Sequence, residues 1–392
     1  MDKNTLPSNN LYDHDMLYFG CVEWDLFQRP QSLVREFARR GRRVFYVEPM
    51  LSIGSIFSDL YHGKIAQTAQ PVADNVVILK PLFSFSTFRS GMTRYVDKYV
   101  FKLWFQWIRA KYQLRDRTIL MMNLPYWWEN ILDRDQFPDA LLLYDCCDDC
   151  RVHSRNDRIL KNMERFERQV AGAADLCLAT SDLLYTKLRQ LNPSTYLAPN
   201  AVDPDYFLEK SMPAPPDMEQ YERPIFGFMG SIYEHIDLEV VRTLSKLITK
   251  GTIVLVGYSD RVVELKQLTD QCKNIVYLGP RPYQHVPAYI RSFDVCLIPY
   301  KAGGRIDTVN PAKLNEYLIF GKPIIGLNTS EMKKYGKYVY LYNDCSELEN
   351  LVPAVLAERE NDPIQQERTA FAYENSWEKR AAQIEGLLTG VL

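Results

Sequence analysis

Short apolar runs alternate with amphipathic stretches along almost the whole chain. Such alternation predicts parallel strands joined by helices that cover both faces of a sheet. In the first half of the chain, strands are expected at 16–20, 44–47, 76–79, 118–122, 141–144 and 176–179. In the second half, strands are expected at 225–229, 253–256, 275–278, 295–298 and 323–326. The pattern therefore predicts two successive series of strands and helices.

A break in this pattern separates the two series. Residues 197–203 (Leu-Ala-Pro-Asn-Ala-Val-Asp) interrupt the alternation, and residues 211–222 form a polar, proline-bearing segment. A chain of 392 residues is also longer than a single hydrophobic core usually supports. We therefore expect an α/β protein with two Rossmann-like doubly wound domains, 1–203 and 204–375, followed by a terminal helix within 376–392.

Residues 309–326 carry the most informative motif, Val-Asn-Pro-Ala-Lys-Leu-Asn-Glu-Tyr-Leu-Ile-Phe-Gly-Lys-Pro-Ile-Ile-Gly. Asn310 suits the N-cap of a helix, and Pro311 suits its first helical position. Lys313 and Glu316 then lie one turn apart on the same face. Bare N–H groups and an ammonium suit a diphosphate, and a carboxylate suits the paired hydroxyls of a ribose. The motif therefore predicts a nucleotide site.

Three other loops at strand ends of the second series could contact the same ligand. Gly230 and Ser231 could bring backbone N–H groups up to a phosphate, and a plain tight turn is the alternative. Backbone groups at Pro280 and Arg281 could hold the edge of a nucleobase, and a proline-ordered loop is the alternative. Residues 301–308 suit sugar recognition or a closing lid, with a structural loop as the alternative.

Composition and charge narrow the class of protein. Hydrophobic residues make up 46% and charged residues 24% of the chain, and the mean hydropathy is −0.27, as in ordinary globular proteins. The net charge of −2 gives no general attraction to nucleic acid, so none is expected as a partner. No apolar run reaches the roughly 20 residues that span a bilayer. The polar residues 1–10 also lack a signal-peptide core, so we expect a cytoplasmic protein with reduced thiols.

Several motifs together resemble the GT-B glycosyltransferases, especially the bacterial enzymes of surface-polysaccharide assembly, with family 4 and glucuronosyltransferase-like members. Residues 310–323 are similar to the donor-site helix of that family, and residues 196–207 are similar to its interdomain segment. Residues 24–33 and 40–49 are similar to the N-terminal part of one subgroup. The resemblance covers nearly the full chain, with the motifs in the family's order. It implies two Rossmann-like domains that face a central cleft, with a C-terminal helix crossing back to the first domain.

The resemblance implies a nucleotide-sugar donor on the second domain, with UDP as the expected nucleotide. Lys313 would contact the diphosphate and Glu316 the ribose, and no cofactor or obligatory metal is implied. Retaining members usually carry a second glutamate eight positions before the ribose-binding one. In this chain that position is Thr308, with Asp307 beside it. Retention and inversion of the anomeric configuration therefore both stay open, with Thr308 and Asn310 also expected at the donor.

An inverting enzyme needs a carboxylate that takes the proton of the acceptor hydroxyl. Asp145, Asp148 and Asp149 lie in or just beyond the expected strand at 141–144. Asp148 is the first choice because it falls beyond the strand, towards the expected cleft. Helix capping and solvation are the alternative for these residues, and His153 is a further candidate.

The same stretch also has cysteines at a spacing seen in metal sites. Cys147 and Cys150 form a C-x-x-C pair, with Cys146 and His153 nearby. Structural zinc normally requires a second pair of ligands, and none follows downstream. We therefore expect no metal site.

The exit of the first strand offers residues for the acceptor side or the cleft, beginning at Gly20. Arg29 could face the donor diphosphate, and Trp24 could stack on a sugar ring. The alternative places Trp24 in the core and Arg29 on the surface at a helix N-terminus.

Residues 89–117 mix basic and aromatic side chains. The basic residues are Arg94, Lys98, Lys102, Arg109, Lys111, Arg115 and Arg117, and the aromatic ones are Tyr95, Tyr99, Phe101, Trp104, Phe105 and Trp107. This composition suits a helix on an anionic membrane surface, which would bring the protein to a lipid-linked acceptor. A helix packed on the sheet with a solvated basic face is the alternative.

We therefore expect a glycosyltransferase that moves a sugar from a nucleoside-diphosphate donor to a glycan or lipid-linked glycan acceptor in polysaccharide assembly. Its expected location is the cytoplasm or the inner face of the cell membrane. A sugar-nucleotide epimerase of the same fold and a non-catalytic sugar-nucleotide-binding protein are the alternatives. A nicotinamide dehydrogenase is disfavoured, because no G-x-G-x-x-G follows the first strand of either domain.

Overall fold

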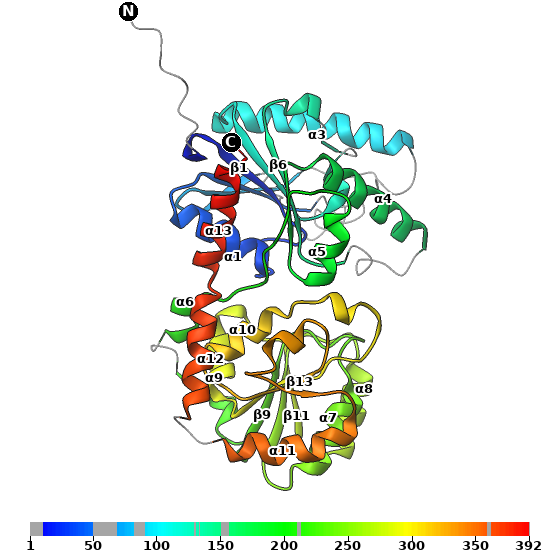
Figure 1. The fold of residues 1–392 in the computed structure, drawn as a ribbon, viewed down its shortest axis with the longest axis vertical. Helices are drawn as coiled ribbons and strands as arrows, with labels where there is room; N and C mark the ends of the chain where they lie inside the picture. The colour runs from blue at the N-terminus through cyan, green and yellow to red at the C-terminus, as the bar shows by residue number, and fades with distance from the viewer. Residues whose placement is uncertain are drawn as a thin grey trace, which may run out of the picture. The chain divides into compact units, whose positions relative to one another are not determined.

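The structure is a computed structural model, which describes residues 11–49, 69–81, 91–128, 131–132, 134–149, 157–209, 213–358 and 362–391. The chain divides into two compact units, whose elements are labelled in Figure 1. Unit 1 comprises Met1–Pro199 and Arg380–Leu392, and unit 2 comprises Asn200–Lys379.

Unit 1 is built on a sheet that has eight strands in the described part of the chain, in the order β3-β4-β2-β1-β5-β6-β7-β8. The strands are β1 Asp15–Phe19, β2 Val44–Val47, β3 Ala69–Ala73, β4 Val76–Leu79, β5 Thr118–Met122, β6 Leu141–Cys146, β7 Leu176–Ala179 and β8 Thr195–Leu197. Neighbouring strands pair in parallel, except that β3 runs antiparallel to β4. Strands β1, β2, β5 and β7 are buried throughout, which explains their continuous apolar sequences.

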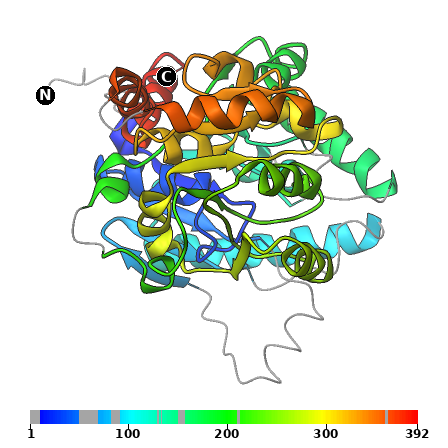
Figure 2. The ribbon, with the colours of Figure 1, turned by 90° about the horizontal axis from the view of Figure 1, so that it is seen from below.

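Helices cover both faces of this sheet. They are α1 Arg29–Arg39, α3 Gly91–Tyr112, α4 Asp157–Ala173 and α5 Asp182–Arg189, with 3-10 turns at Leu11–Asp13, Pro125–Trp127 and Arg134–Gln136. Alternate strand residues point to opposite faces, and Leu17 and Phe19 of β1 share a cluster with Phe101 and Ile108 of α3. Figures 1 and 2 show α1 on the other side of the sheet from α3.

The last helix, α13 (Trp377–Thr389), begins in unit 2 and ends in unit 1. Its Glu385 carboxylate pairs with Arg40 Nε at 2.7 Å and with Arg42 Nε at 2.5 Å. These two arginines directly follow α1, so α13 is fastened to unit 1 beside that helix. The predicted C-terminal helix that returns to the first domain is confirmed.

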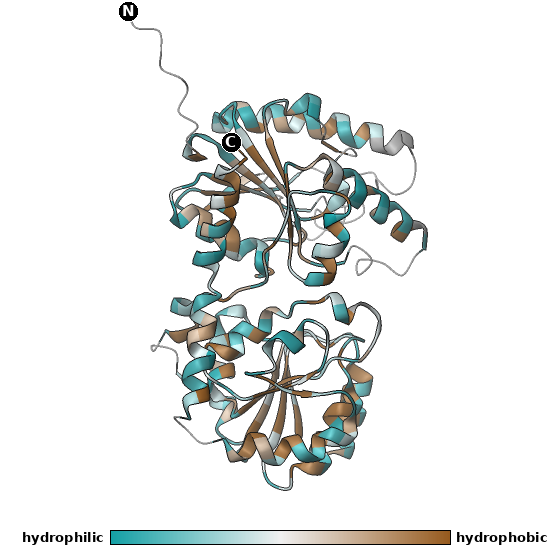
Figure 3. Cartoon of the chain, in the orientation of Figure 1, coloured by the Kyte–Doolittle hydropathy of each residue, from teal (hydrophilic) through white to brown (hydrophobic). Residues whose placement is uncertain are grey.

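Unit 2 contains a second parallel sheet, with six strands in the described part of the chain in the order β11-β10-β9-β12-β13-β14. The strands are β9 Ile225–Met229, β10 Thr252–Val256, β11 Ile275–Gly279, β12 Val295–Ile298, β13 Ile324–Leu327 and β14 Tyr340–Tyr342. Figure 3 shows these strands as largely hydrophobic, with helices of mixed hydrophilic and hydrophobic residues around them.

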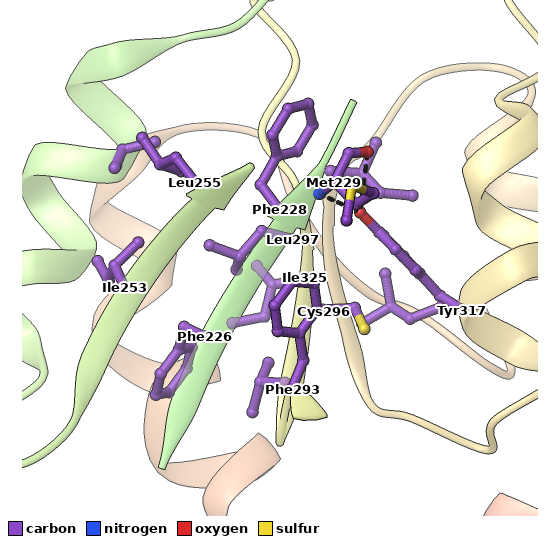
Figure 4. Packing of buried hydrophobic residues seen from close by; sticks show 14 of the residues in the cluster. Phe226, Phe228, Met229, Ile253, Leu255, Phe293, Cys296, Leu297, Tyr317 and Ile325 are labelled. Atoms are coloured by element: carbon purple, nitrogen blue, oxygen red, sulfur yellow. Dashed lines mark hydrogen bonds between the residues drawn. The ribbon is translucent and has the colours of Figure 1, made fainter. Parts of the chain in front are cut away.

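The helices of unit 2 are α6 Pro204–Leu208, α7 Leu238–Leu247, α8 Val262–Gln271, α9 Val286–Ser292, α10 Ala312–Leu318, α11 Leu348–Ala357 and α12 Pro363–Glu374. Short 3-10 turns lie at Pro216–Met218, Tyr283–His285, Gly304–Thr308, Met332–Tyr335 and Cys345–Glu347. Tyr317 of α10 reaches into the core, where its hydroxyl accepts a hydrogen bond from the Met229 amide at 2.9 Å (Figure 4). This bond anchors α10 at the carboxyl end of β9.

No helix in the described part of the chain is both long enough and apolar enough to cross a bilayer.

Candidate functional site

The loop before α10 differs from the sequence prediction. The N-cap position of α10 is Pro311, and no side chain caps the helix, so the predicted N-cap role of Asn310 is wrong. Asn310 is buried, and its Oδ1 accepts a hydrogen bond from the Asn200 amide at 3.0 Å. Its Nδ2 donates to Tyr335 Oη at 3.2 Å and to Glu331 Oε2 at 3.4 Å. Asn310 therefore ties the loop before α10 to two other segments of unit 2, one at Asn200 and one at the turn that contains Glu331 and Tyr335. These bonds satisfy both the donor and the acceptor of a buried amide.

Lys313 extends from α10 over the carboxyl end of β9. Its Nζ donates to Tyr300 Oη at 3.2 Å and lies 5.4 Å from the centre of the Phe228 ring. A Cβ atom added at Gly230 would lie 3.1 Å from Lys313 Cε. Within the described residues, Lys313 takes part in no ion pair within 4.0 Å. The ammonium is held by aromatic faces and one neutral hydroxyl, so its charge is available to an anion.

Gly230 has a different role from the predicted one. Its amide donates to the Val256 carbonyl at 2.9 Å, so this N–H is used inside the fold and the prediction that it faces a phosphate is wrong. Gly230 has a φ of +144°, and a Cβ atom at Gly257 would lie 2.0 Å from the Gly230 carbonyl oxygen. The two glycines therefore let the carboxyl ends of β9 and β10 approach closely, beneath the Lys313 side chain. Ser231, which follows, is exposed.

Glu316 lies one turn after Lys313 on α10 and is half-buried. Burial raises the pKa of its carboxyl from 4.5 to about 7, against the opposing effect of the Lys313 charge. The group therefore changes its protonation state close to neutral pH. As a carboxylate, it can accept hydrogen bonds from two vicinal hydroxyls.

His235 belongs to the same region, and the sequence interpretation missed it. It lies in the loop between β9 and α7, and its ring packs edge-on against Tyr300 with centroids 5.7 Å apart. Burial, together with the charges of Lys313 and Arg261, lowers its pKa from 6.5 to about 4. The imidazole is therefore neutral at pH 7, close to the Lys313 ammonium. In the sequence, the one sign of a role for His235 was its position five residues after Gly230, where the strand ends. His235 belongs to no recognisable motif.

Arg281 is built into the loop after β11. Its guanidinium pairs with Asp217 at 2.8 Å and donates to Tyr289 Oη at 2.7 Å and to the Leu278 carbonyl at 2.6 Å. The side chain therefore ties this loop to the segment that precedes β9. Contact of its backbone with a nucleobase stays a prediction.

Thr308 closes a 3-10 turn, Gly304–Thr308, and is half-buried. The neighbouring Asp307 carbonyl accepts a hydrogen bond from Ser330 Oγ at 3.1 Å. The segment expected as a loop is therefore partly ordered by its own turn, and the sugar contact of Thr308 stays a prediction.

Asp145 in unit 1 forms a buried ion pair with Arg29. The closest atoms, Arg29 Nη2 and Asp145 Oδ1, are 2.7 Å apart, and Tyr18 Oη donates to Oδ2 at 2.8 Å. The Asp145 and Arg29 side chains are 0% and 4% exposed. Asp145 is therefore wrong as a candidate base, since its carboxylate is already used by a cation and a phenol. The expected surface position of Arg29 is also wrong, and its guanidinium is not open towards a diphosphate.

Asp148 lies just beyond β6 and is half-buried. Burial raises its pKa from 3.8 to about 6, while the Cys147 thiol and the Arg29 charge act in the opposite direction. Cys147 Sγ donates to Asp148 Oδ2 at 3.8 Å. A partly exposed carboxylate with a pKa near 6 suits a general base at neutral pH far better than Asp145 does.

Asn123, directly after β5, is a second residue that the sequence interpretation missed. Its Nδ2 donates to the Asp145 carbonyl at 2.9 Å and to Cys147 Sγ at 3.4 Å. Its Oδ1 is buried and has no hydrogen-bond partner among the described residues. A lone polar residue at the end of an apolar strand was its sequence signal.

Trp24 and Gly20 belong to the core of unit 1. The Trp24 ring packs edge-on against Tyr46 at 5.2 Å and is buried, so the core alternative is confirmed and a sugar-stacking role is wrong. A Cβ atom at Gly20 would lie 2.0 Å from Tyr46 Oη. Gly20 therefore makes room for Tyr46, whose hydroxyl donates to the Val22 carbonyl at 2.6 Å.

His153 and Cys150 lie outside the described residues. Within the residues that the structure describes, no group of three or more His, Cys, Asp and Glu side chains is arranged to hold a metal ion.

Comparison with known proteins gives one curated relative and many similar structures. No family model matches the sequence. The chain is 26% identical over 219 residues to the putative teichuronic acid biosynthesis glycosyltransferase TuaH of Bacillus subtilis. This match covers 52% of the chain and 55% of TuaH, so the chain spans about half the length of this relative.

The similar structures cover nearly all of the chain. Sucrose-phosphate synthase from Thermosynechococcus elongatus has a TM-score of 0.68 at 16% identity, with 96% of this chain and 99% of that chain covered. HepE from Anabaena in complex with UDP-glucose has a TM-score of 0.62 at 14% identity, with the same coverage. Trehalose 6-phosphate synthase from Burkholderia multivorans has a TM-score of 0.68 at 10% identity, with 96% and 98% covered. At these identities, the likeness establishes the fold.

Proposed function

We propose that this chain, which has the GT-B fold predicted from its sequence, is a glycosyltransferase that uses a nucleoside-diphosphate sugar, with UDP as its nucleotide. The acceptor would be a glycan or lipid-linked glycan in polysaccharide assembly. The observation that carries this proposal is that Lys313 and Glu316 lie one turn apart on α10. Lys313 presents a cation without an ion pair among the described residues, and Glu316 presents a partly buried carboxyl one turn away.

The chemistry of this pair matches the two polar ends of a nucleoside diphosphate. The Lys313 ammonium would bind the diphosphate and would stabilise it as it becomes the leaving group, which is an electrostatic form of catalysis. The Glu316 carboxylate would accept hydrogen bonds from the ribose hydroxyls. His235, neutral at pH 7, would add a hydrogen bond near Lys313. The similarity to TuaH, a putative glycosyltransferase, and to HepE in complex with UDP-glucose supports the proposed activity and the proposed UDP-sugar donor.

We assign the general base to Asp148 of unit 1, for a transfer that inverts the anomeric carbon. Asp148 would accept the proton of the acceptor hydroxyl while that oxygen forms its bond to the sugar and the diphosphate leaves. Its pKa of about 6 leaves it ionised at pH 7. Thr308 stands where retaining members usually carry a glutamate, which favours inversion.

We also propose that the enzyme works in the cytoplasm. All cysteines in the described part of the chain are free thiols, as is usual in a reducing compartment.

Calorimetric titration with UDP tests the proposal directly. Wild-type protein should bind UDP, and Lys313→Ala should lose affinity by about 100-fold, because a charge-assisted contact contributes roughly 1.5–3 kcal/mol. Lys246→Ala, which removes an exposed lysine of α7, is the matched control and should bind as wild type does. Equal affinities of all three proteins would refute the diphosphate assignment.

A panel of UDP-sugars, with and without glycan acceptors, then identifies the reaction. Transfer that depends on an acceptor supports the proposed function. Conversion of the donor sugar without an acceptor would identify an epimerase instead. Binding without turnover across the panel would identify a binding protein.

A further inference from the structure

Helix α3 exposes a row of large apolar side chains. Tyr95, Tyr99, Leu103 and Trp107 are 76%, 58%, 50% and 47% exposed. They follow one another at intervals of four residues, slightly more than one helical turn, so they form a continuous stripe along α3. Val96, at 37% exposed, widens the stripe. We call these five residues the α3 stripe.

The α3 stripe is not the face by which the helix packs on the protein. Phe101, Trp104, Phe105 and Ile108 occupy the opposite side of α3 and are between 0% and 7% exposed in the core of unit 1. The sequence alternatives for this segment were a membrane-surface helix or a helix packed on the sheet with a solvated basic face. The structure shows that α3 packs on the core of unit 1, as the second alternative predicts. The exposed face of the helix, however, is mostly apolar along its centre and is not uniformly basic. Folding of unit 1 therefore does not explain the stripe.

Basic side chains border the α3 stripe along one edge and at its carboxyl-terminal end. Lys98, Lys102 and Arg109 lie along one edge, where they line a groove of about 410 Å³ together with Asp135. At the carboxyl-terminal end of the stripe, four residues after Trp107, Lys111 Nζ lies 4.7 Å from the centre of the Trp107 ring. The helix carries five basic residues and one acidic residue, the buried Asp97, in a chain whose net charge is −2. Positive charge is therefore concentrated around this stripe.

We propose that the α3 stripe docks unit 1 on the surface of an anionic lipid bilayer. Tyrosine, tryptophan and leucine suit the boundary between headgroups and acyl chains, and long basic side chains at the edges reach the lipid phosphates. The attraction to anionic lipid follows from the concentration of lysine and arginine on this helix. A protein partner or a second copy of the chain would also cover an apolar stripe, but neither explains the basic residues along its edge and at its end.

Docking through α3 goes beyond the proposed transfer reaction and does not depend on it. An enzyme held on a bilayer would reach acceptors that carry a lipid. The docking itself requires only the exposed face of one helix of unit 1.

Vesicle flotation with the full-length protein tests the proposal. Wild type should float with vesicles of phosphatidylcholine and phosphatidylglycerol at low salt, and far less with phosphatidylcholine alone. Binding should weaken in 1 M salt, where the screening length falls to about 3 Å. Lys98→Glu combined with Lys102→Glu, and separately Leu103→Glu combined with Trp107→Glu, should each lower the bound fraction at least about tenfold.

The matched control carries Val262→Glu and Val263→Glu, which place the same two charges on an exposed apolar pair of α8, 57% and 71% exposed. This control should float as wild type does. Thermal unfolding and UDP titration of each variant, without lipid, show whether it is folded, and they keep the docking result separate from the proposed function.

Three outcomes would overturn the proposal. They are no flotation of wild type with anionic vesicles, equal flotation of all variants, and equal flotation with neutral and anionic vesicles. Sedimentation velocity tests the remaining alternative, in which a second copy of the chain covers the α3 stripe. Self-association that Leu103→Glu with Trp107→Glu abolishes, without any vesicle binding, would assign the stripe to a second copy of the chain.

Discussion

The two units each place charged side chains near the carboxyl ends of parallel strands, but they use the charges differently. In unit 1, the Arg29 cation is buried against Asp145, with Tyr18 bound to the same carboxylate. In unit 2, Lys313 is held by aromatic rings and a hydroxyl, and makes no ion pair among the residues described. A paired and buried cation stabilises the fold, whereas a cation without a counter-ion can bind an anionic ligand. The contrast separates a structural ion pair from a candidate binding site.

The carboxylates show the same contrast. Asp145 is fully buried between two donors. Asp148 and Glu316 are both half-buried, and burial raises their pKa values to about 6 and about 7. These two groups keep contact with solvent and titrate near neutral pH, as proton-transfer and binding groups often do.

The largest effect is expected at Asp148. Asp148→Asn should lower sugar transfer by about 10²–10⁴-fold, because it removes the proposed general base, and should leave UDP affinity unchanged. Wild-type transfer should fall as the pH drops through about 6, where Asp148 becomes protonated. Initial-rate assays across pH measure both effects. Asp139→Asn, an exposed residue of unit 1, is the control. Normal turnover of Asp148→Asn would show that Asp148 is not the general base.

Replacing each cation by methionine tests the comparison of the two units. Arg29→Met should lower the free energy of unfolding by about 3–5 kcal/mol, because it leaves Asp145 buried without its partner. Lys313→Met should leave stability near that of wild type, because no ion pair among the described residues is broken, and should weaken UDP binding instead. Urea unfolding and UDP titration of both variants measure the two quantities. Similar losses of unfolding free energy in both variants would contradict the proposed difference between Arg29 as a structural cation and Lys313 as a ligand-binding one.

Glu316 should give a smaller effect that depends on pH. Its folded pKa of about 7 is above the ordinary 4.5, so the carboxylate is lost as the pH falls through 7, and UDP affinity should fall with it. Glu316→Gln should bind UDP about tenfold more weakly and should discriminate less against 2′-deoxy-UDP. Glu239→Gln, an exposed residue of α7, is the control in the same titrations. Unchanged discrimination in Glu316→Gln would exclude the ribose contact.

His235 should have the smallest effect. His235→Asn should change UDP affinity by only about threefold, the value of one neutral hydrogen bond. A bound diphosphate should raise the imidazole pKa from about 4, so wild type should take up more protons on binding than the variant. Calorimetry in buffers of different ionisation enthalpy measures this uptake. Equal uptake by both proteins would place His235 away from the diphosphate.

Much of the fold could be predicted from local patterns. All eleven strands expected from apolar runs are present at or within two residues of their predicted bounds. The edge strands β3, β8 and β14 were missed, because they are only partly buried and so lack a continuous apolar signal. Strands β8 and β14 are also only three residues long. The helix at 312–318 was recognised, but Asn310 was placed at its N-cap, since a local rule does not include the competing partners Asn200 and Tyr335.

The amino-acid sequence by itself determined the succession of strands and helices, the break between the two series and the motif on α10. These features depend on periodicity and turn chemistry within a few residues. Tertiary structure alone decided which charges are neutralised. Arg29 meets Asp145 across 116 positions of sequence, and the Gly230 amide is used by Val256 of a neighbouring strand. Electrostatic and hydrogen-bonding roles depend on distance and burial, and folding brings together residues that are far apart in the sequence.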